Sequence, residues 1–278
     1  MAYTMTDIGE TTGVEFTGIS GSELVDSSIA QACLHALDRR GVVVFREAHV
    51  DDRDLVEFSK LLGHVVALPL GGESEYPEIQ RVTRDPSKSK LAAYREATFF
   101  WHIDGTTDEV PNKATLLTAR QVSDDGGGDT EFANTYAAYE ELPDAEKERV
   151  RDLRVVHSFA ASQLLAVPNP SAAERAIWDR TPAREHPLVW TRPSGRRSML
   201  VGATAGEIVG WSETAGRELL DRLLEWSTRP RYVLRHTWRR GDLVIWDNTG
   251  MLHRALPYSE SSARLMHRTS LAGEEAVA

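Results

Sequence analysis

Two short stretches of this chain, about 150 residues apart, carry side chains that suggest a shared site. The first reads Trp101-His102-Ile103-Asp104, and the second runs from Leu243 through Asp247 to His253. In a strand, alternate residues face the same side, so His102 and Asp104 could both point inward while Ile103 packs behind them. Leu243 to Trp246 reads as a core strand between turns, which places His253 early on the next strand. We therefore expect a fold in which distant strands converge at one mouth, as in a β-barrel.

Two imidazoles and one carboxylate on one face of a metal ion leave three coordination positions open. This arrangement is typical of non-haem Fe(II) oxygenases, which must hold a cosubstrate and O2 on the same iron. Zinc accepts the same ligands, so a non-oxygenase β-barrel with a zinc site is an alternative that the three residues leave open. A lone His-x-Asp pair occurs by chance in many chains, and the assignment needs further support.

Two arginines near the end of the chain provide that support. Arg264 and Arg268 are four residues apart and share a face on either a strand or a helix. Guanidinium binds carboxylates in a two-pronged geometry and stays charged when desolvated, so this pair suits recognition of an anion next to the metal. The competing interpretation is an ordinary basic pair on the surface.

Composition restricts the class of protein further. The chain has 278 residues, 41% of them hydrophobic, and a net charge of −10, which argues against a nucleic-acid partner. Cys33 is the single cysteine, so an internal disulfide and a cysteine-rich metal site are excluded. The N-terminus lacks the pattern of a signal peptide, and no stretch is long and apolar enough for a membrane span. We expect a cytoplasmic protein that acts on a small molecule; a homo-oligomer is compatible with the sequence.

Helix and strand signals indicate one domain over residues 1–278, with strands that close on themselves and helices outside. We predict a helix over 27–40 that stops at Gly41, a buried strand over 42–45, and a helix that starts at Asp51 or Asp52 and ends at Gly63. Further helices are predicted at about 144–153 and 214–226. Residues 160–184 are small, polar and rich in proline, and we predict a long loop there that acts as a lid or insertion.

These residues resemble the TauD/TfdA-type Fe(II)/2-oxoglutarate dioxygenases as an ordered set, from about Arg40 to Leu271. The resemblance implies a mainly β fold with flanking helices, a double-stranded β-helix (a jelly roll of the cupin type). It also implies that His102, Asp104 and His253 bind the iron, that Thr130 and Arg264 hold the distal carboxylate of 2-oxoglutarate, and that Arg268 grips an anionic substrate. The matching pieces are Trp101–Asp104, Gly127–Thr130, Asn134 with Tyr136–Tyr139, Gly241–Asn248 with His253, and Arg264–Thr269.

Two departures from the family pattern concern the substrate. Relatives that act on taurine have a histidine and a tyrosine after the second helix, whereas Val65–Gly72 has neither. Thr98 replaces an asparagine four residues before the first iron-binding histidine, and we expect it to contact the substrate. Both changes make the pocket more apolar than a taurine site.

The resulting hypothesis is an enzyme that uses Fe(II), 2-oxoglutarate and O2. It would oxidise a C–H bond of a small, anionic organic substrate, most simply by hydroxylation, with release of succinate and CO2. Desaturation or oxidative cleavage in a biosynthetic pathway, with the same cofactors, is the alternative outcome. Asp104 argues against halogenation, which needs a small residue at that position. The substrate's identity lies in loops that one sequence does not define, here 68–75, 87–99, 106–111 and 160–184.

Overall fold

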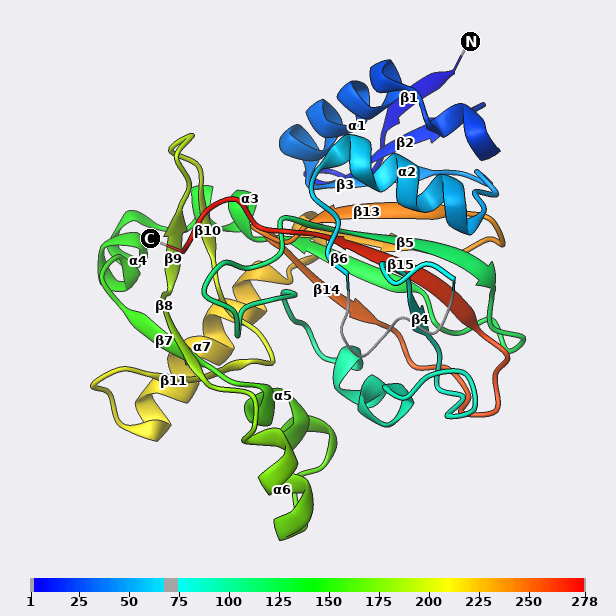
Figure 1. Cartoon of the computed structure of the whole chain (residues 1–278). Helices are drawn as coiled ribbons and strands as arrows, with labels where there is room; N and C mark the ends of the chain where they lie inside the picture. Colours follow the sequence, from blue (N-terminus) through cyan, green and yellow to red (C-terminus); the bar gives the residue numbers. More distant parts are fainter. Residues whose placement is uncertain (1–2, 68–74, 278) are drawn as a thin grey trace.

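The computed structural model describes residues 3–67 and 75–277, and it is built around a seven-stranded sheet (Figure 1). β13 (Leu243–Asp247) lies in the middle of this sheet, antiparallel to β3 (Val42–Phe45) on one side and to β5 (Ala114–Gln121) on the other. β15 (Leu265–Leu271) follows β5, so the strand that precedes His253 and the strand that carries Arg268 flank the same neighbour. The remaining strands of the sheet are β1 (Thr4–Asp7), β2 (Val14–Thr17) and β4 (Gln80–Val82).

A smaller sheet faces this one and supplies the other wall of the site. Its strands, in order, are β12 (Val233–His236), β6 (Thr130–Asn134) and β14 (Met251–Ala255). Buried side chains from both sheets form one apolar cluster that includes Leu117, Phe132, Trp246 and Met266. This cluster holds the two sheets together, and the open space of the site lies at its edge.

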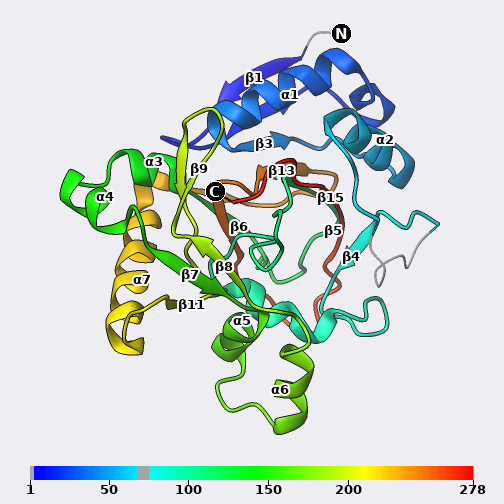
Figure 2. The ribbon, with the colours of Figure 1, turned by 60° about the vertical axis from the view of Figure 1, so that its left-hand side comes forward.

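Helices cover the outer face of the large sheet, as the sequence predicted. α1 (Ser27–Arg40) and α2 (Asp52–Leu62) pack on this face at one end of the molecule, and both views show them there (Figures 1 and 2). α1 ends at Gly41, whose φ of 71° is left-handed, because glycine adopts this conformation without steric cost. The Asp51 side chain accepts a hydrogen bond from the backbone N–H of Asp54 and so caps α2.

The middle of the chain forms a second layer. The three-stranded sheet β11-β7-β8 (Ala205–Ile208, Arg154–His157 and Arg184–Pro187) packs against α7 (Glu213–Ser227), beside the hairpin of β9 (Val189–Thr191) and β10 (Arg197–Met199). The short helices α3 (Thr135–Glu140) and α4 (Asp144–Val150) precede it. The fold is thus a mixture of sheet and helix, with strands around the site and helices outside, as expected in outline.

Residues 160–184 differ from the prediction, because they are not one structureless loop. The chain forms α5 (Phe159–Ala166) and α6 (Ala172–Trp178), at the end of the molecule opposite α1 and α2 (Figure 2). The side chains of Ser158 and Ser171 cap these helices, and Glu174 completes a capping box with Ser171. Local capping therefore orders a stretch whose composition suggested a loop.

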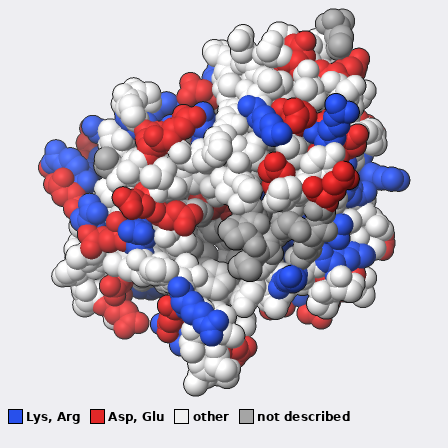
Figure 3. Space-filling model, in the orientation of Figure 1, with Lys and Arg blue, Asp and Glu red and all other residues white. Residues whose placement is uncertain are grey.

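On the face shown in Figure 3, basic and acidic side chains are interspersed over the described residues. β12, which lies between Arg229 and Arg240, is an edge strand of the smaller sheet. Arg235 pairs there with Asp129, and Arg231 pairs with Glu141. Among the described residues, no helix has the length and apolarity to cross a membrane.

Candidate active site

The three predicted ligands meet at a short contact between β14 and the segment after η2, a 3-10 helix over Ala92–Phe99. His102 and His253 form an isolated antiparallel bridge, in which each backbone N–H donates to the other residue's carbonyl, at 3.0 and 2.8 Å. The ligand atoms of His102, Asp104 and His253 all lie within 4.8 Å of one another. The prediction that the three residues come together is therefore confirmed by the geometry.

The local structure of the first pair differs from the prediction. His102 and Asp104 were expected on a strand, but only His102 is paired, and Asp104 begins a turn. Gly105, with a φ of 79°, redirects the chain at this point. A single bridge and a tight turn therefore bring the side chains of His102 and Asp104 together, as a strand was expected to do.

Burial and neighbouring charges set the protonation states of the three groups. Burial lowers the pKa of both histidines, and in His253 the neighbouring His102 adds to the effect, bringing its pKa to about 3. Burial alone would raise the pKa of Asp104, but Arg268 and the two histidines hold it below its usual range. Near neutral pH the site thus offers two neutral nitrogens and one carboxylate. Since Fe(II) in oxygenases is held by this donor set, the residues fit that metal.

Hydrogen bonds to neighbouring protein groups orient two of these side chains. His102 Nδ1 lies 2.8 Å from the carbonyl oxygen of Phe100, which leaves Nε2 of the ring for a metal. Thr115 on β5 donates to Asp104 Oδ2 at 2.9 Å, and Asn248 in turn donates to Thr115 at the same distance. Hydrogen bonds within the protein therefore orient two of the three ligands, His102 and Asp104, whereas the Nδ1 of His253 has no partner among the described residues.

Arg268 pairs with one of the three predicted metal ligands. Its Nη2 lies 2.8 Å from Asp104 Oδ2. A mostly buried carboxylate attracts the nearest cation, because an unpaired charge in that position is costly. The Nε of Arg268 is buried and has no hydrogen-bond partner among the described residues. A substrate role for Arg268 stays a prediction.

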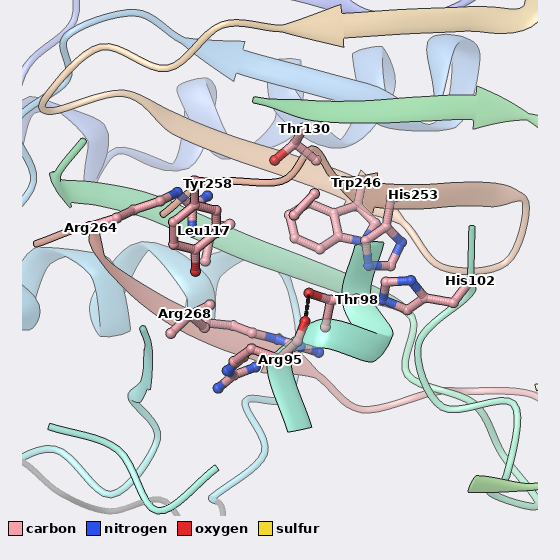
Figure 4. A pocket seen from close by; sticks show the side chains of 12 residues that line it. Arg95, Thr98, His102, Leu117, Thr130, Trp246, His253, Tyr258, Arg264 and Arg268 are labelled. Atoms are coloured by element: carbon pink, nitrogen blue, oxygen red, sulfur yellow. Dashed lines mark hydrogen bonds between the residues drawn. The ribbon is translucent and has the colours of Figure 1, made fainter. Parts of the chain in front are cut away.

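One cavity brings the predicted cosubstrate residues next to the histidines (Figure 4). Arg264 enters from just before β15 and is 3% exposed. Its Nη2 donates to the carbonyl oxygen of Gly128 at 3.2 Å, and its guanidinium lies 4.9 Å from the ring centre of Tyr258. Thr130 starts β6 on the opposite wall, where its hydroxyl accepts from Trp238 Nε1 at 2.9 Å. No described carboxylate pairs with Arg264 (within 4.0 Å), so it is free to bind one.

A second cavity, of about 410 Å³, adjoins the first at His102 and Thr98. Thr98 lies on η2 and lines both cavities, and its hydroxyl donates to the carbonyl oxygen of Arg95 at 2.6 Å. The opposite wall comes from α5 and α6, through Phe159, Gln163 and Ile177. The stretches 87–99, 106–111 and 160–184, predicted to carry specificity, all contribute to this cavity. Most of 68–75, also predicted to do so, lies outside the described residues, as does the later part of the Val65–Gly72 stretch.

Sequence reasoning missed several residues of the site. Arg95 is 8% exposed and lines both cavities, and Tyr258 covers Arg264. Trp246 was expected only as part of a core strand, yet its ring centre lies 4.7 Å from that of His253, with the two rings tilted, and it lines the first cavity. Arg95 stands seven residues before His102, but only the winding of η2 shows that it faces the site.

Comparison with known proteins agrees with the geometry. Residues 4–270 match the family described as taurine catabolism dioxygenase TauD, TfdA family. The 2,4-dichlorophenoxyacetate dioxygenase of Burkholderia sp. (strain RASC), which depends on alpha-ketoglutarate, is 32% identical, with 85% of this chain and 83% of the relative covered. The alpha-ketoglutarate-dependent sulfate ester dioxygenase of Pseudomonas putida is 33% identical, with 94% and 87% covered.

Solved structures extend the likeness to the fold. AAD-2 in complex with Mn(II) and N-oxalylglycine superimposes with a TM-score of 0.83 at 28% identity, over 100% of both chains. The putative alpha-ketoglutarate-dependent 2,4-D dioxygenase of Burkholderia xenovorans superimposes with a TM-score of 0.79 at 26% identity, over 98% of this chain and 97% of the other. The predicted enzyme class, a 2-oxoglutarate-dependent dioxygenase with Fe(II), 2-oxoglutarate and O2 as its cofactors, is confirmed. The chain belongs to the TauD/TfdA family of dioxygenases.

Proposed function

We propose that this dioxygenase oxidises a C–H bond of a small, anionic organic substrate, most simply by hydroxylation, with release of succinate and CO2. One observation carries the proposal: Arg264, a buried arginine that pairs with no carboxylate of the described residues, lies in the same cavity as the two histidines. That arrangement suits a metal whose cosubstrate has a carboxylate at its far end. We further propose that the two facing sheets form a double-stranded β-helix, and that residues 1–278 act as one domain.

His102, Asp104 and His253 would hold the iron. Their donor atoms lie within 4.8 Å of one another, and the hydrogen bonds to Phe100 and Thr115 fix the orientation of His102 and Asp104. Bound iron, together with 2-oxoglutarate and O2, supplies an oxidant strong enough to break a C–H bond. The contribution of the chain is to position the partners and to keep bulk water away from them.

Arg264 and Thr130 would bind the distal carboxylate of 2-oxoglutarate. The guanidinium supplies a charge-assisted, two-pronged contact, and its burial beneath Tyr258 strengthens that contact, since little water competes. Thr130 adds a hydroxyl from the opposite wall, already oriented by Trp238. Two walls from different sheets thus fix the length and direction of the bound chelator.

The substrate would occupy the cavity of about 410 Å³ between η2 and the pair α5–α6. We propose that residues 160–184 act as a lid over it, because Phe159, Gln163 and Ile177 form its outer wall. Thr98 would contact the substrate from η2, and Arg268 would contribute positive charge beside the metal. Relatives named for 2,4-dichlorophenoxyacetate and for sulfate esters support a substrate that combines an anionic group with an organic body.

Two alternatives rest on less. Pentalenolactone F synthase of Streptomyces arenae is 28% identical over 88% of this chain, which leaves desaturation or cleavage in a biosynthetic pathway as the second candidate outcome. A zinc-binding barrel without oxygenase activity would leave the buried Arg264 with no anion to bind, and family membership argues against it.

An anaerobic titration of the metal-free protein tests the proposal directly. Addition of Fe(II) and then 2-oxoglutarate should produce a weak visible charge-transfer band, whereas Zn(II) in place of Fe(II) should stay colourless. Exposure to air with a panel of small organic anions should then release succinate above the background rate for at least one of them. Absence of the band at saturating 2-oxoglutarate would contradict the cosubstrate assignment.

A further inference from the structure

Arg95 is a buried cation to which the proposed chemistry gives no partner. It lies on η2, is 8% exposed, and lines both the cosubstrate cavity and the larger cavity beside it. Its Nη2 donates to the backbone carbonyl of Arg81 at 3.2 Å, and its Nε is buried without a hydrogen-bond partner among the described residues. No described carboxylate lies within 4.0 Å of it. Arg46, by contrast, is more exposed and pairs with both Glu15 and Asp242.

Burying the guanidinium of Arg95 without a counter-charge costs free energy, and a bound anion would remove this cost. Burial, followed by the nearby charge of Arg268, lowers the pKa of Arg95 to about 10, so its guanidinium still carries a full charge at neutral pH. A buried charge needs a counter-charge or a full set of hydrogen bonds to be tolerated. The negative charge of the Asp104 carboxylate acts on Arg95, but this carboxylate already pairs with Arg268 and belongs to the proposed metal site.

The bound cosubstrate does not supply the missing partner. If 2-oxoglutarate chelates the metal and its distal carboxylate binds Arg264, both of its anionic ends are taken. Figure 4 shows Arg95 and Arg268 side by side, away from Thr130 and on the same side of the cavity as Thr98. Two cations therefore lie side by side in the cosubstrate cavity, and one of them, Arg95, also lines the larger cavity.

We propose that Arg95, together with Arg268, binds the anionic head of the primary substrate, which is an amphiphilic monoanion. This inference rests on the proposed function and names the substrate class for the same site. The larger cavity supports it, since Arg95 is the only lysine or arginine among the described residues that line it. Most of the remaining wall is apolar or uncharged, with Tyr94, Phe159 and Ile177 among the contributors. A single oxyanion group (sulfate, sulfonate or carboxylate) at Arg95 would leave an uncharged organic body to fill about 410 Å³.

Calorimetry on an inert complex tests this without turnover. The protein is loaded with Mn(II) and N-oxalylglycine and titrated with hexyl sulfate, with heptanoate and with 1-hexanol, which has no charged head. We expect at least one of the two anions to bind. Arg95→Gln should lower the affinity for that anion by at least about tenfold, because a charge-assisted contact is lost. The weak affinity for 1-hexanol should not change. Arg95→Lys keeps the charge but not the two-pronged geometry, and should lie between wild type and Arg95→Gln.

Lys88→Gln is the matched control, because Lys88 stands just before the same helix, is 43% exposed in its side chain and pairs with Asp85. It should leave anion affinity unchanged. If Arg95→Gln does not fold, Arg95→Lys decides: an anion affinity equal to that of wild type overturns the proposal. Failure of both anions to bind wild type, or an equal loss for 1-hexanol, also overturns it. Retained N-oxalylglycine binding in the variants separates these outcomes from a failure of the proposed function, in which wild type itself would not bind the analogue.

Discussion

His253 is the ligand that most directly tests the metal centre. His253→Ala removes one of the two neutral nitrogens, and we expect the affinity for Fe(II) or Mn(II) to fall by more than about 100-fold. The metal-free protein should still fold, with a free energy of unfolding within about 2 kcal/mol of wild type, because the bridge to His102 uses backbone atoms only. Metal content after dialysis and urea unfolding measure the two quantities.

His35→Ala is the control, since His35 is exposed on α1 and lies outside both cavities. Its metal content should equal that of wild type. Normal metal binding by His253→Ala would show that the ligand assignment is wrong.

Arg264 is expected to select the cosubstrate. Arg264→Ala should weaken 2-oxoglutarate binding by about 2–5 kcal/mol, because a buried carboxylate would lose its charge-assisted partner. An anaerobic titration monitored by the charge-transfer band measures this affinity. Arg120→Ala offers a comparison, as Arg120 pairs with Asp52 away from the site. Equal cosubstrate affinity in both variants would show that a residue other than Arg264 binds the distal carboxylate of 2-oxoglutarate.

The residues of the site divide according to what one sequence can reveal. His102, Asp104, His253, Thr130 and Arg264 belong to motifs, and the structure brings them together as predicted. Arg95 belongs to no such motif, and its role depends on the winding of a 3-10 helix that amphipathic periodicity does not detect.

At the scale of elements, local signals predicted the ends of helices well. Gly41 and Asp51 act at the termini where the sequence placed them, because capping is decided by neighbouring residues. The same kind of signal was overlooked at Ser171, whose capping box with Glu174 starts α6. The strand expected at His102 failed for another reason: its pairing partner is a residue about 150 positions away, and the pairing extends over a single bridge.

Gly202 supports the first metal ligand from outside the site. Its φ is 108°, and a Cβ added there would lie 2.5 Å from the carbonyl oxygen of Trp101. This oxygen accepts a hydrogen bond from the backbone N–H of Ala203. Gly202→Ala should therefore cost about 2–5 kcal/mol, combining a left-handed backbone with a clash against main chain. Because Trp101 precedes His102, metal affinity should fall as well.

Gly195 provides a matched control for that substitution. Its φ of 84° is also left-handed, but an added Cβ would meet no atom of the described residues within 4 Å. Gly195→Ala should cost only the backbone part, about 1–2 kcal/mol, and leave metal affinity unchanged. Urea unfolding and metal content compare the pair, and equal effects of both substitutions would contradict the proposed contact.

At the scale of the whole molecule, the sequence left the pairing of distant strands undecided. β13 pairs with β3 and β5, and β6 pairs with β12 and β14, so each partner is far away along the chain. One sequence carries no record of such pairings, whereas the buried character of β13 was plain from Leu243 to Trp246. The resemblance to a known family, more than periodicity, supplied the expected architecture.

Buried neutral histidines make the stability of the molecule depend on pH. Burial, and then the neighbouring His186, lower the pKa of His157 to about 3. The unfolded chain, with a histidine pKa near 6.5, binds more protons between these values, so stability is full above about pH 6.5 and falls on acidification. His157 alone should contribute a loss of up to about 1.4 kcal/mol per pH unit in this window.

His157→Gln tests this, because glutamine stays neutral throughout. Urea unfolding of the metal-free protein at about pH 7, 6 and 5 should give a shallower decline for the variant than for wild type. The same decline in both proteins would mean that His157 is protonated in the folded state.

The reciprocal bridge between His102 and His253 has a consequence for the order in which this enzyme matures. Two main-chain hydrogen bonds hold the ligands in register, and His102 and Asp104 keep their orientation through bonds to Phe100 and Thr115. The chain can therefore fold first and acquire its ion last. A chelator should strip the ion, and fresh metal should restore activity, with no unfolding in between. The cell's free metal pool at the moment of loading, rather than the folding pathway, then decides which ion the enzyme carries.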